Sequence, residues 1–322
     1  MMQKDRVTIH LSVNGDPSEV IKWFQGMLLF EAKQMSLTNF TKNRERAYKK
    51  AVFFTETEKE VLLQKYNISL GDGTNLVYCG KSSSSNVVML SAMVDYNIYR
   101  ENKNSILNLI DTIMMNSGIV GQISDLEDSF WQNYTDLAMY KMRGKSLEGV
   151  PQKLSPTFTN KMVVDTEKLP GYEKQIDNIW FGAAWKMWFN TPYYEFVSED
   201  VLRNYKNCFE NRKVSASCIN ITLYEDLSDY DKPENRTLQW AFKEAINFQG
   251  VVEKYRKTGI NRVDDPEVMI ETGNFEHGGV RLIRGFFDVN DNSVPKSKAA
   301  KEKILEYDEK GEIIWHNEII YN

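Results

Sequence analysis

The stretch that decides the fold is RVTIHLSV, residues 6–13. Its apolar residues alternate with polar ones, which is the period of a β-strand with one buried face. These apolar residues are Val7, Ile9, Leu11 and Val13. A helical pattern follows in GDPSEVIKWFQGMLLFEAKQ, residues 15–34, where apolar residues recur on one helical face. A strand followed directly by an amphipathic helix indicates helices packed on a sheet.

The same order of strand and helix recurs further along the chain. NVVMLSAMVDYNI, residues 86–98, is typical of a long apolar strand, and NSILNLIDTIMMNSG, residues 104–118, is typical of a helix that ends at its glycine. The pattern predicts an α+β fold, with α/β as the alternative. We expect two sheet-plus-helix units in layers, followed by a C-terminal β-hairpin.

The domain organisation follows from composition. GKSLEGVPQKLSPTFTN, residues 144–160, is rich in Gly, Pro, Ser and Thr and has no apolar period, which favours a loop. We therefore expect an N-terminal unit, a loop or boundary, a C-terminal unit, and a loop with the terminal hairpin that turns at 308–311. Their ranges are 1–145, 146–160, 161–290 and 291–322.

Composition excludes several classes of function. The 322 residues are 42% hydrophobic and carry a formal net charge of -5, whereas general nucleic-acid binding needs a basic face. The apolar runs are too short to span a bilayer, and no signal peptide is visible. Three cysteines do not form a disulfide framework for this length. We expect a soluble bacterial protein of the cytoplasm, with no nucleic-acid or membrane partner.

No intact cofactor motif is present. In GDGTNLVYCGKSS, residues 71–83, a phosphate-binding loop would need glycine at the position of Asn75, because backbone amides there must wrap the phosphates. His10, His277 and His316 have no Cys or His at metal-ligand spacing. We therefore expect no cofactor and no metal bound by these residues.

Two acidic segments are the candidates for chemistry. SDLEDSFWQNYTD, residues 124–136, contains Asp125 and Asp128, and LYEDLSDYDKPENR, residues 223–236, contains Glu225 and Asp231. Either could hold a divalent cation for a metal-dependent hydrolase. The structural alternative is a pair of solvated loops, in which residues 231 and 234 form a capping box around Pro233.

The aromatic stretch NIWFGAAWKMWFN, residues 178–190, contains three tryptophans and two phenylalanines. Its aromatic content favours a strand. Because it is apolar on nearly all sides, the stretch is typical of a covered core, and the alternative is an aromatic-lined groove for a small ligand.

The helix pattern in KPENRTLQWAFKEAINF, residues 232–248, places Trp240 on its polar side, where a tryptophan rimmed by charge has the composition of an interface hot spot. With the acidic segment before it, this pattern predicts a surface for another protein, a basic one. The leading hypothesis is a protein-binding chain, such as an inhibitor or immunity-type neutraliser of a basic toxin, rather than an enzyme. The predicted partner-binding residues are Glu225, Asp226, Asp229, Tyr230 and Trp240.

Overall fold

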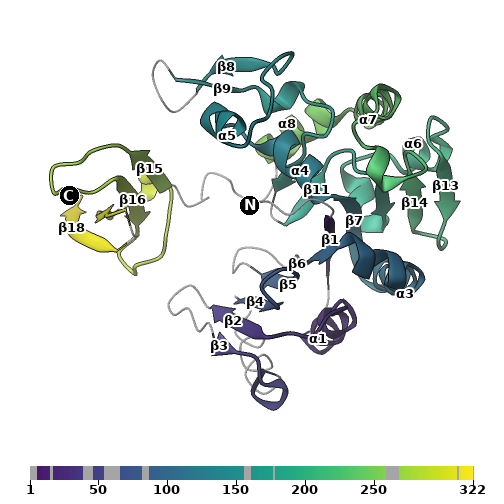
Figure 1. The fold of residues 1–322 in the computed structure, drawn as a ribbon, viewed down its shortest axis with the longest axis horizontal. Coiled ribbons are helices and arrows are strands. Elements are labelled where there is room, and N and C mark those ends of the chain that lie inside the picture. Colours follow the sequence, from purple (N-terminus) through teal and green to yellow (C-terminus); the bar gives the residue numbers. More distant parts are fainter. Residues whose placement is uncertain are drawn as a thin grey trace. The chain divides into compact units, whose positions relative to one another are not determined.

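The computed structural model describes residues 6–14, 17–38, 46–53, 66–81, 87–155, 161–176, 178–258, 268–309 and 312–321. The chain divides into two compact units, residues 1–252 and 253–322. Figure 1 shows the elements of both units. Helices and large antiparallel sheets make an α+β fold, as the sequence predicts.

The first unit is built on a ten-stranded sheet whose order is β13-β14-β12-β7-β1-β6-β5-β4-β2-β3. Every neighbouring pair in it is antiparallel, which rules out the parallel sheet of an α/β fold. Its strands are β1 (Arg6–Val13), β2 (Gln34–Thr38), β3 (Arg46–Ala47), β4 (Tyr66–Gly71), β5 (Leu76–Lys81), β6 (Val88–Asp95), β7 (Gly118–Asp125), β12 (Lys186–Phe189), β13 (Glu210–Lys213) and β14 (Ile219–Thr222). Two small hairpins accompany it, β8 (Gln152–Leu154) with β9 (Met162–Val164), and β10 (Lys174–Ile176) with β11 (Ile179–Phe181).

Helices occur between these strands and after them. They are α1 (Pro17–Gly26), α3 (Tyr96–Asn116), α4 (Leu126–Asn133), α5 (Leu137–Met142), α6 (Glu199–Asn204), α7 (Pro233–Ala245) and α8 (Phe248–Thr258). Short 3-10 turns are η1 (Thr166–Lys168), η2 (Thr191–Glu195), η3 (Leu227–Asp229) and η5 (Lys296–Lys298). In the part of the chain that the structure describes, none of the helices combines the length and apolarity needed to cross a membrane.

β1 lies between β6 and β7 and is buried on both faces, not on one as its alternation suggests. Val7, Ile9, Leu11 and Val13 are all fully buried. Leu11 lies close to Gly121, as does Met114 of α3, so this apolar face packs under α3. On the other face the Ser12 hydroxyl donates to the carbonyl of Asn178 at 2.5 Å. The Ser12 hydroxyl can therefore be buried, because the Asn178 carbonyl accepts its hydrogen bond.

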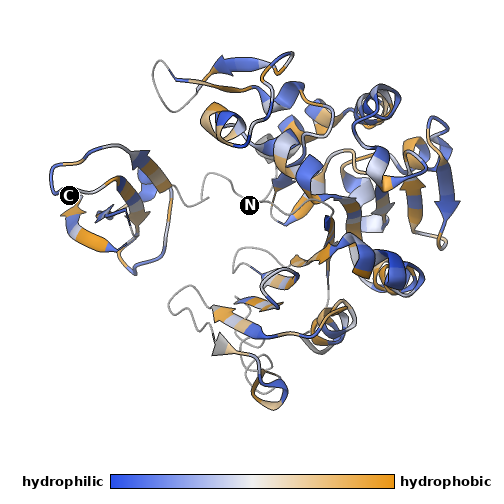
Figure 2. Ribbon diagram, in the orientation of Figure 1, coloured by the Kyte–Doolittle hydropathy of each residue, from blue (hydrophilic) through white to orange (hydrophobic). Residues whose placement is uncertain are grey.

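The aromatic stretch 178–190 belongs to the core. It forms two short strands in different sheets, β11 and β12, rather than one continuous strand. Trp180, Trp185 and Trp188 are 5%, 3% and 0% exposed. Figure 2 shows the hydrophobic segments of the strands along the ribbon. The stretch offers no open aromatic groove, because its rings pack inside the unit.

The large sheet takes strands from both sides of residues 146–160, where we expected a loop or boundary. β7 precedes that segment, β12 follows it, and the two pair directly. The compact units divide between Val252 and Glu253. A loop that leaves a sheet and returns to it produces the same polar composition as a linker, so composition alone does not distinguish them.

The second unit is a four-stranded antiparallel sheet of β15 (Val268–Thr272), β16 (Arg281–Phe287), β17 (Lys301–Tyr307) and β18 (Ile313–Ile320). The predicted C-terminal hairpin is present as β17 and β18. Two buried glutamates are held inside this unit. Glu306 accepts from the backbone N–H groups of His277 and Gly279 at 3.1 and 2.7 Å, and Glu302 pairs with Arg284 at 3.1 Å.

Candidate functional site

Three strands of the large sheet end at the same edge. β6 and β7 are both antiparallel to β1, and β7 and β14 are both antiparallel to β12, so β6, β7 and β14 run in one direction. β6 ends at Asp95 and β7 ends at Asp125, while Asp226 comes shortly after the end of β14. The turn between β4 and β5 reaches the same edge, because the Asp95 N–H donates to Asn75 Oδ1 at 2.7 Å.

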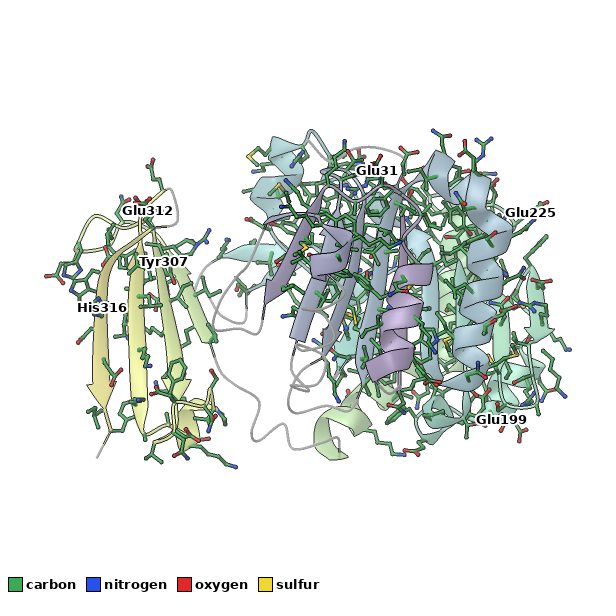
Figure 3. The ribbon with its side chains drawn as sticks, turned by 90° about the horizontal axis from the view of Figure 1, so that it is seen from below. Glu31, Glu199, Glu225, Tyr307, Glu312 and His316 are labelled. Atoms are coloured by element: carbon green, nitrogen blue, oxygen red, sulfur yellow. The ribbon has the colours of Figure 1, made fainter. Side chains whose placement is uncertain are left out.

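Four aspartates therefore gather at this edge, which we call the acidic end: Asp72, Asp95, Asp125 and Asp226. Figure 3 shows Glu225 at this end of the strands and Glu199 at the opposite end. Arg6 begins β1 directly opposite Asp95 in the sheet. A cation at the first position of the central strand partly balances the carboxylates around it.

Each carboxylate of the acidic end is held by backbone N–H groups. Asp72 accepts from the N–H of Asn75 at 2.7 Å, and Asp95 accepts from the N–H of Asn97 at 2.8 Å. Asp125 accepts from the N–H of Asp128 at 2.9 Å as the N-cap of α4. These bonds cap turns and helices, and they also fix the direction of each negative charge.

Asp226 is the most exposed of the four aspartates of the acidic end. It is the N-cap of η3 and accepts from the Ser228 N–H at 2.9 Å and the Ser228 hydroxyl at 2.8 Å. These two bonds lower the pKa of Asp226, so its charge persists in mildly acidic solution. The Tyr96 hydroxyl reaches Asp226 at 3.4 Å from the start of α3. The acidic loop, residues 225–231, is thereby hydrogen-bonded to the residue that follows β6.

The two acidic segments of the sequence meet around Tyr230. Burial and then the charges of Asp125, Glu127, Asp128 and Asp231 raise the pKa of its hydroxyl. Burial also raises the pKa of Asp125 to about 6, and the charge of Asp128 adds to that rise. Separate stretches of sequence thus produce one region of negative potential, because β7 and β14, the two neighbours of β12, end at the same edge of the sheet.

Two cations of α7 bond to partners inside the unit, which the sequence did not indicate. Arg236 donates to Asp128 through both terminal nitrogens, at 3.0 and 2.5 Å, and to Gln239 at 2.9 Å. Further along, Lys243 donates to the carbonyls of Leu169, Pro170 and Tyr172 at 3.2, 3.3 and 3.0 Å. Burial lowers the pKa of Lys243 to about 8. These bonds attach α7 to α4 and to the segment before β10.

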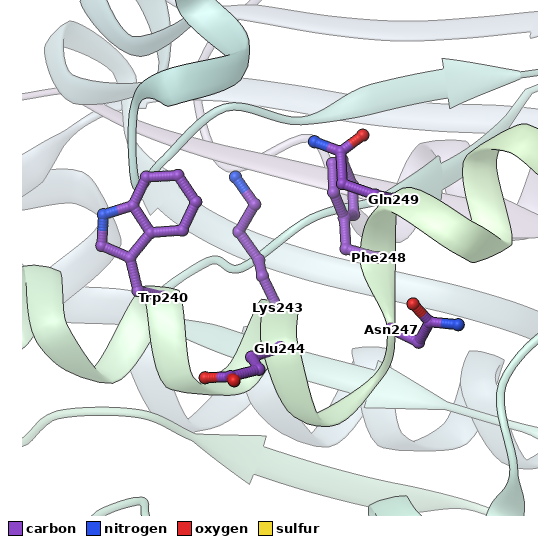
Figure 4. A pocket seen from close by; sticks show the side chains of 6 residues that line it. All are labelled: Trp240, Lys243, Glu244, Asn247, Phe248 and Gln249. Carbon is purple, nitrogen blue, oxygen red and sulfur yellow. The ribbon is translucent and has the colours of Figure 1, made fainter.

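Trp240 remains on the surface beside this buried row, with 41% of its area exposed. It lines a groove of about 320 Å³ with Lys243, Glu244, Asn247, Phe248 and Gln249. Figure 4 shows Lys243 between the rings of Trp240 and Phe248, and its Nζ lies 4.7 and 4.8 Å from the two ring centres. The tryptophan face is thus held in place by a cation and left partly open to solvent.

The predicted partner-binding residues fall into two neighbouring parts. Glu225 and Asp226 are exposed at the acidic end, and Asp229 and Tyr230 are half-buried beside them. Asp229 forms an ion pair with Lys232 at 2.7 Å, and this pair reduces the negative potential that Asp229 adds to the surface. Trp240 lies about 10 Å further along α7 than its first residue, at 1.5 Å per residue. The acidic residues therefore precede α7 in the chain, and the tryptophan lies near the middle of the helix.

One expectation about the acidic segments is wrong. The N-cap of α7 is Lys232, which makes no side-chain cap bond, so the capping box of Asp231 and Glu234 is not formed. Within the described ranges, no group of three His, Cys, Asp or Glu residues could hold a metal ion. Of the carboxylates considered for a metal-dependent hydrolase, Asp125 caps α4 and Asp128 pairs with Arg236.

Asp72 and Asp95 were missed as parts of this region. Asp95 had a signal in the sequence, because an apolar strand that ends in Asp before a helix occurs twice, as MVDYNI and QISDLE. These two aspartates, Asp95 and Asp125, cap the helices that follow them, α3 and α4. Two strands that end in this way at one edge place their capping carboxylates together. Asp72 had no comparable signal, because its position depends on the β4–β5 hairpin.

The chain was also compared with known proteins. No protein family and no curated protein matches it. Among solved structures it is similar to Pseudomonas aeruginosa T6SS protein PA0821, with 12% identity, 76% of this chain and 74% of that chain covered, and a TM-score of 0.46. A similarity this distant supports no conclusion about the function of the chain.

Proposed function

We propose that the chain binds a basic protein through its acidic end and acts as an inhibitor, such as a cytoplasmic immunity-type neutraliser of a basic toxin. The observation that carries the proposal is the gathering of four aspartates, each held by hydrogen bonds, where β6, β7 and β14 end. Glu225 adds an exposed charge at the same place. A partner with a positive surface would meet charges that are already oriented.

Fixed carboxylates suit recognition because little ordering is required on binding. A flexible acidic loop would lose conformational entropy when it docks, whereas Asp226 is already held by Ser228 and Tyr96. Complementary charge chiefly raises the rate of association and excludes wrong partners. The acidic end therefore supports selectivity for basic proteins.

Trp240 would supply the apolar part of the contact. Its exposed ring is supported by Lys243, so it keeps a defined orientation. Interface hot spots are enriched in tryptophan next to charged residues. A partner that covers both the acidic end and Trp240 would lie across the outer side of α7.

The proposal is tested with a basic secreted protein encoded beside the gene for this chain. Calorimetric titration of that protein would measure binding, and its toxic activity would be measured with and without the chain. We expect tight binding and loss of toxic activity. The double variant Glu225→Lys, Asp229→Lys should weaken binding at least about tenfold, because rim charges of this kind control encounter and specificity.

The control is Glu195→Lys, which matches the single variant Glu225→Lys in its change of charge. Glu195 is exposed in η2, which follows the opposite end of β12 from Lys186. This variant changes the net charge of the chain without changing the acidic end. Equal loss of binding in the control and the double variant would contradict a local acidic site, and a neighbour that does not bind the parent would contradict the inhibitor role.

A further inference from the structure

β18 is an edge strand with an exposed surface. Among the described residues its only strand neighbour is β17, and seven of its eight residues are exposed. Figure 3 shows His316 on this strand at the border of the small sheet. An edge strand of this length and apolar content is usually protected or paired, because its outer backbone groups can accept another strand.

The direction of its backbone groups follows from the pairing with β17. The Tyr321 N–H donates to the carbonyl of Ala300 at 2.8 Å, and bonding residues alternate along an antiparallel strand. From Trp315 onward, beyond the register shift at the start of the strand, odd-numbered residues therefore bond to β17, and His316 and Glu318 present their N–H and C=O groups outward. The Glu318 N–H indeed donates to its neighbour, Asn317 Oδ1, at 2.9 Å and not to β17.

The sequence of the strand, IIWHNEII, is complementary to itself when two copies run antiparallel about Asn317. His316 of one copy then lies opposite Glu318 of the other, and the outward-facing residues form the hydrogen-bonded pairs. The resulting side-chain pairs are Ile314 with Ile320, Trp315 with Ile319, His316 with Glu318, and Asn317 with Asn317. Aromatic and β-branched pairs of this kind stabilise sheets. The His316 ring would donate a hydrogen bond to the Glu318 carboxylate, which within one copy lies 3.9 Å from Lys303 Nζ.

Other registers that keep the same backbone bonds are poorer. Centring the pair on His316 places Ile314 opposite Glu318 and Trp315 opposite Asn317. Centring it on Glu318 places two glutamates directly opposite each other, which is destabilising. The side chains therefore select one two-fold arrangement, as a dimer with an isologous interface requires.

The geometry points to a second copy of this chain as the occupant of this edge. The two β18 strands pair antiparallel about Asn317, and the two four-stranded sheets become one continuous sheet. This dimer is independent of the proposed binding of a basic protein, because the acidic end belongs to the first unit.

Sedimentation velocity of the full chain over a range of micromolar concentrations tests the dimer. The parent should form a reversible dimer. His316→Glu should weaken it at least about tenfold, since it places two carboxylates opposite each other in both cross-strand pairs. Adding Glu318→Lys to that variant should restore the dimer, because each pair then joins opposite charges. A monomeric parent, or a dimer that His316→Glu leaves unchanged, would overturn the proposal.

A cross-link tests the register even if the charge variants fold poorly. Opposed residues of a non-hydrogen-bonded pair lie about 4.5 Å apart at Cα, within reach of a disulfide. Asn317→Cys should therefore give a disulfide-linked dimer on mild oxidation. Ile319→Cys is the control, because its two copies would lie about 13 Å apart. The parent measures any background from Cys79, Cys208 and Cys218. Equal cross-linking of the two variants, or none with Asn317→Cys, would overturn this register.

Discussion

Arg236 on α7 and Asp128 on α4 form a bidentate ion pair in which both carboxylate oxygens are used, at 2.5 and 3.0 Å. Asp128 is 7% exposed. Its backbone N–H also donates to Asp125 of the acidic end. The pair therefore connects the helix that carries Trp240 with the edge that carries the negative charge.

Asp128→Ala should lower the free energy of unfolding by about 3–5 kcal/mol, because it leaves the buried guanidinium without its partner. Urea denaturation followed by circular dichroism measures the change. The double variant Asp128→Leu, Arg236→Met should cost less than the sum of the losses from Asp128→Leu alone and Arg236→Met alone, since neither charge is then left without its partner. Additive losses would show that the pair is not energetically coupled.

Trp185→Ala should behave as a core lesion. The ring is 3% exposed and its Nε1 donates to the carbonyl of Tyr224 at 2.8 Å. We expect a loss of about 3–5 kcal/mol, seen as a lower thermal midpoint or as insoluble protein. Trp240→Ala is the control and should cost less than about 1 kcal/mol, because its ring is on the surface. Similar melting of the Trp185 variant and the parent would contradict the core assignment.

Much of the fold could be predicted because local patterns determine it. The alternation in residues 6–13 and the helical spacing in residues 104–118 correspond to β1 and the body of α3. The continuity of the large sheet could not be predicted in the same way. It depends on the pairing of β7 with β12 across a long intervening segment, and such pairing leaves no local signature in one sequence.

The residues of the candidate site were predicted in part for a related reason. The acidic loop and the exposed tryptophan are visible as composition in residues 223–248. Their surroundings are not, because Asp95 and Asp125 reach the loop only through strand order. The polar residues of α7 also misled the sequence reading, since Arg236 and Lys243 are satisfied by buried partners and not by water.

Asp125 should make stability depend on pH. Burial raises its folded-state pKa to about 6 from an ordinary value of 3.8. Between these values the folded chain holds a proton that the unfolded chain releases, so the stabilising contribution is complete below pH 3.8 and is lost as pH rises through about 6. Asp125→Asn keeps an effective cap and should be more stable than the parent at pH 8 by about 1–2 kcal/mol, after allowance for solvent screening. Urea titrations at pH 5 and pH 8 compare the two chains, and identical pH dependence would contradict this assignment.

The acidic end and Trp240 should affect different steps of binding to a basic partner. Glu225→Lys should lower the association rate, and this effect should be larger at low salt than at high salt, because screening at a Debye length of about 8 Å or less already suppresses the attraction. Asp226→Asn should act in the same direction with little change in folding, since asparagine can keep the bond from the Ser228 N–H. Replacement of Asp226 by lysine is a poorer test, because it removes the cap of η3 together with the charge.

Trp240→Ala should instead raise the dissociation rate at both salt concentrations, because the ring contributes buried apolar area. Stopped-flow kinetics with the identified partner at two salt concentrations separates these effects, with Glu195→Lys as the control. Association rates of all the acidic variants that equal the parent's rate at both salt concentrations would remove the acidic end from the interface.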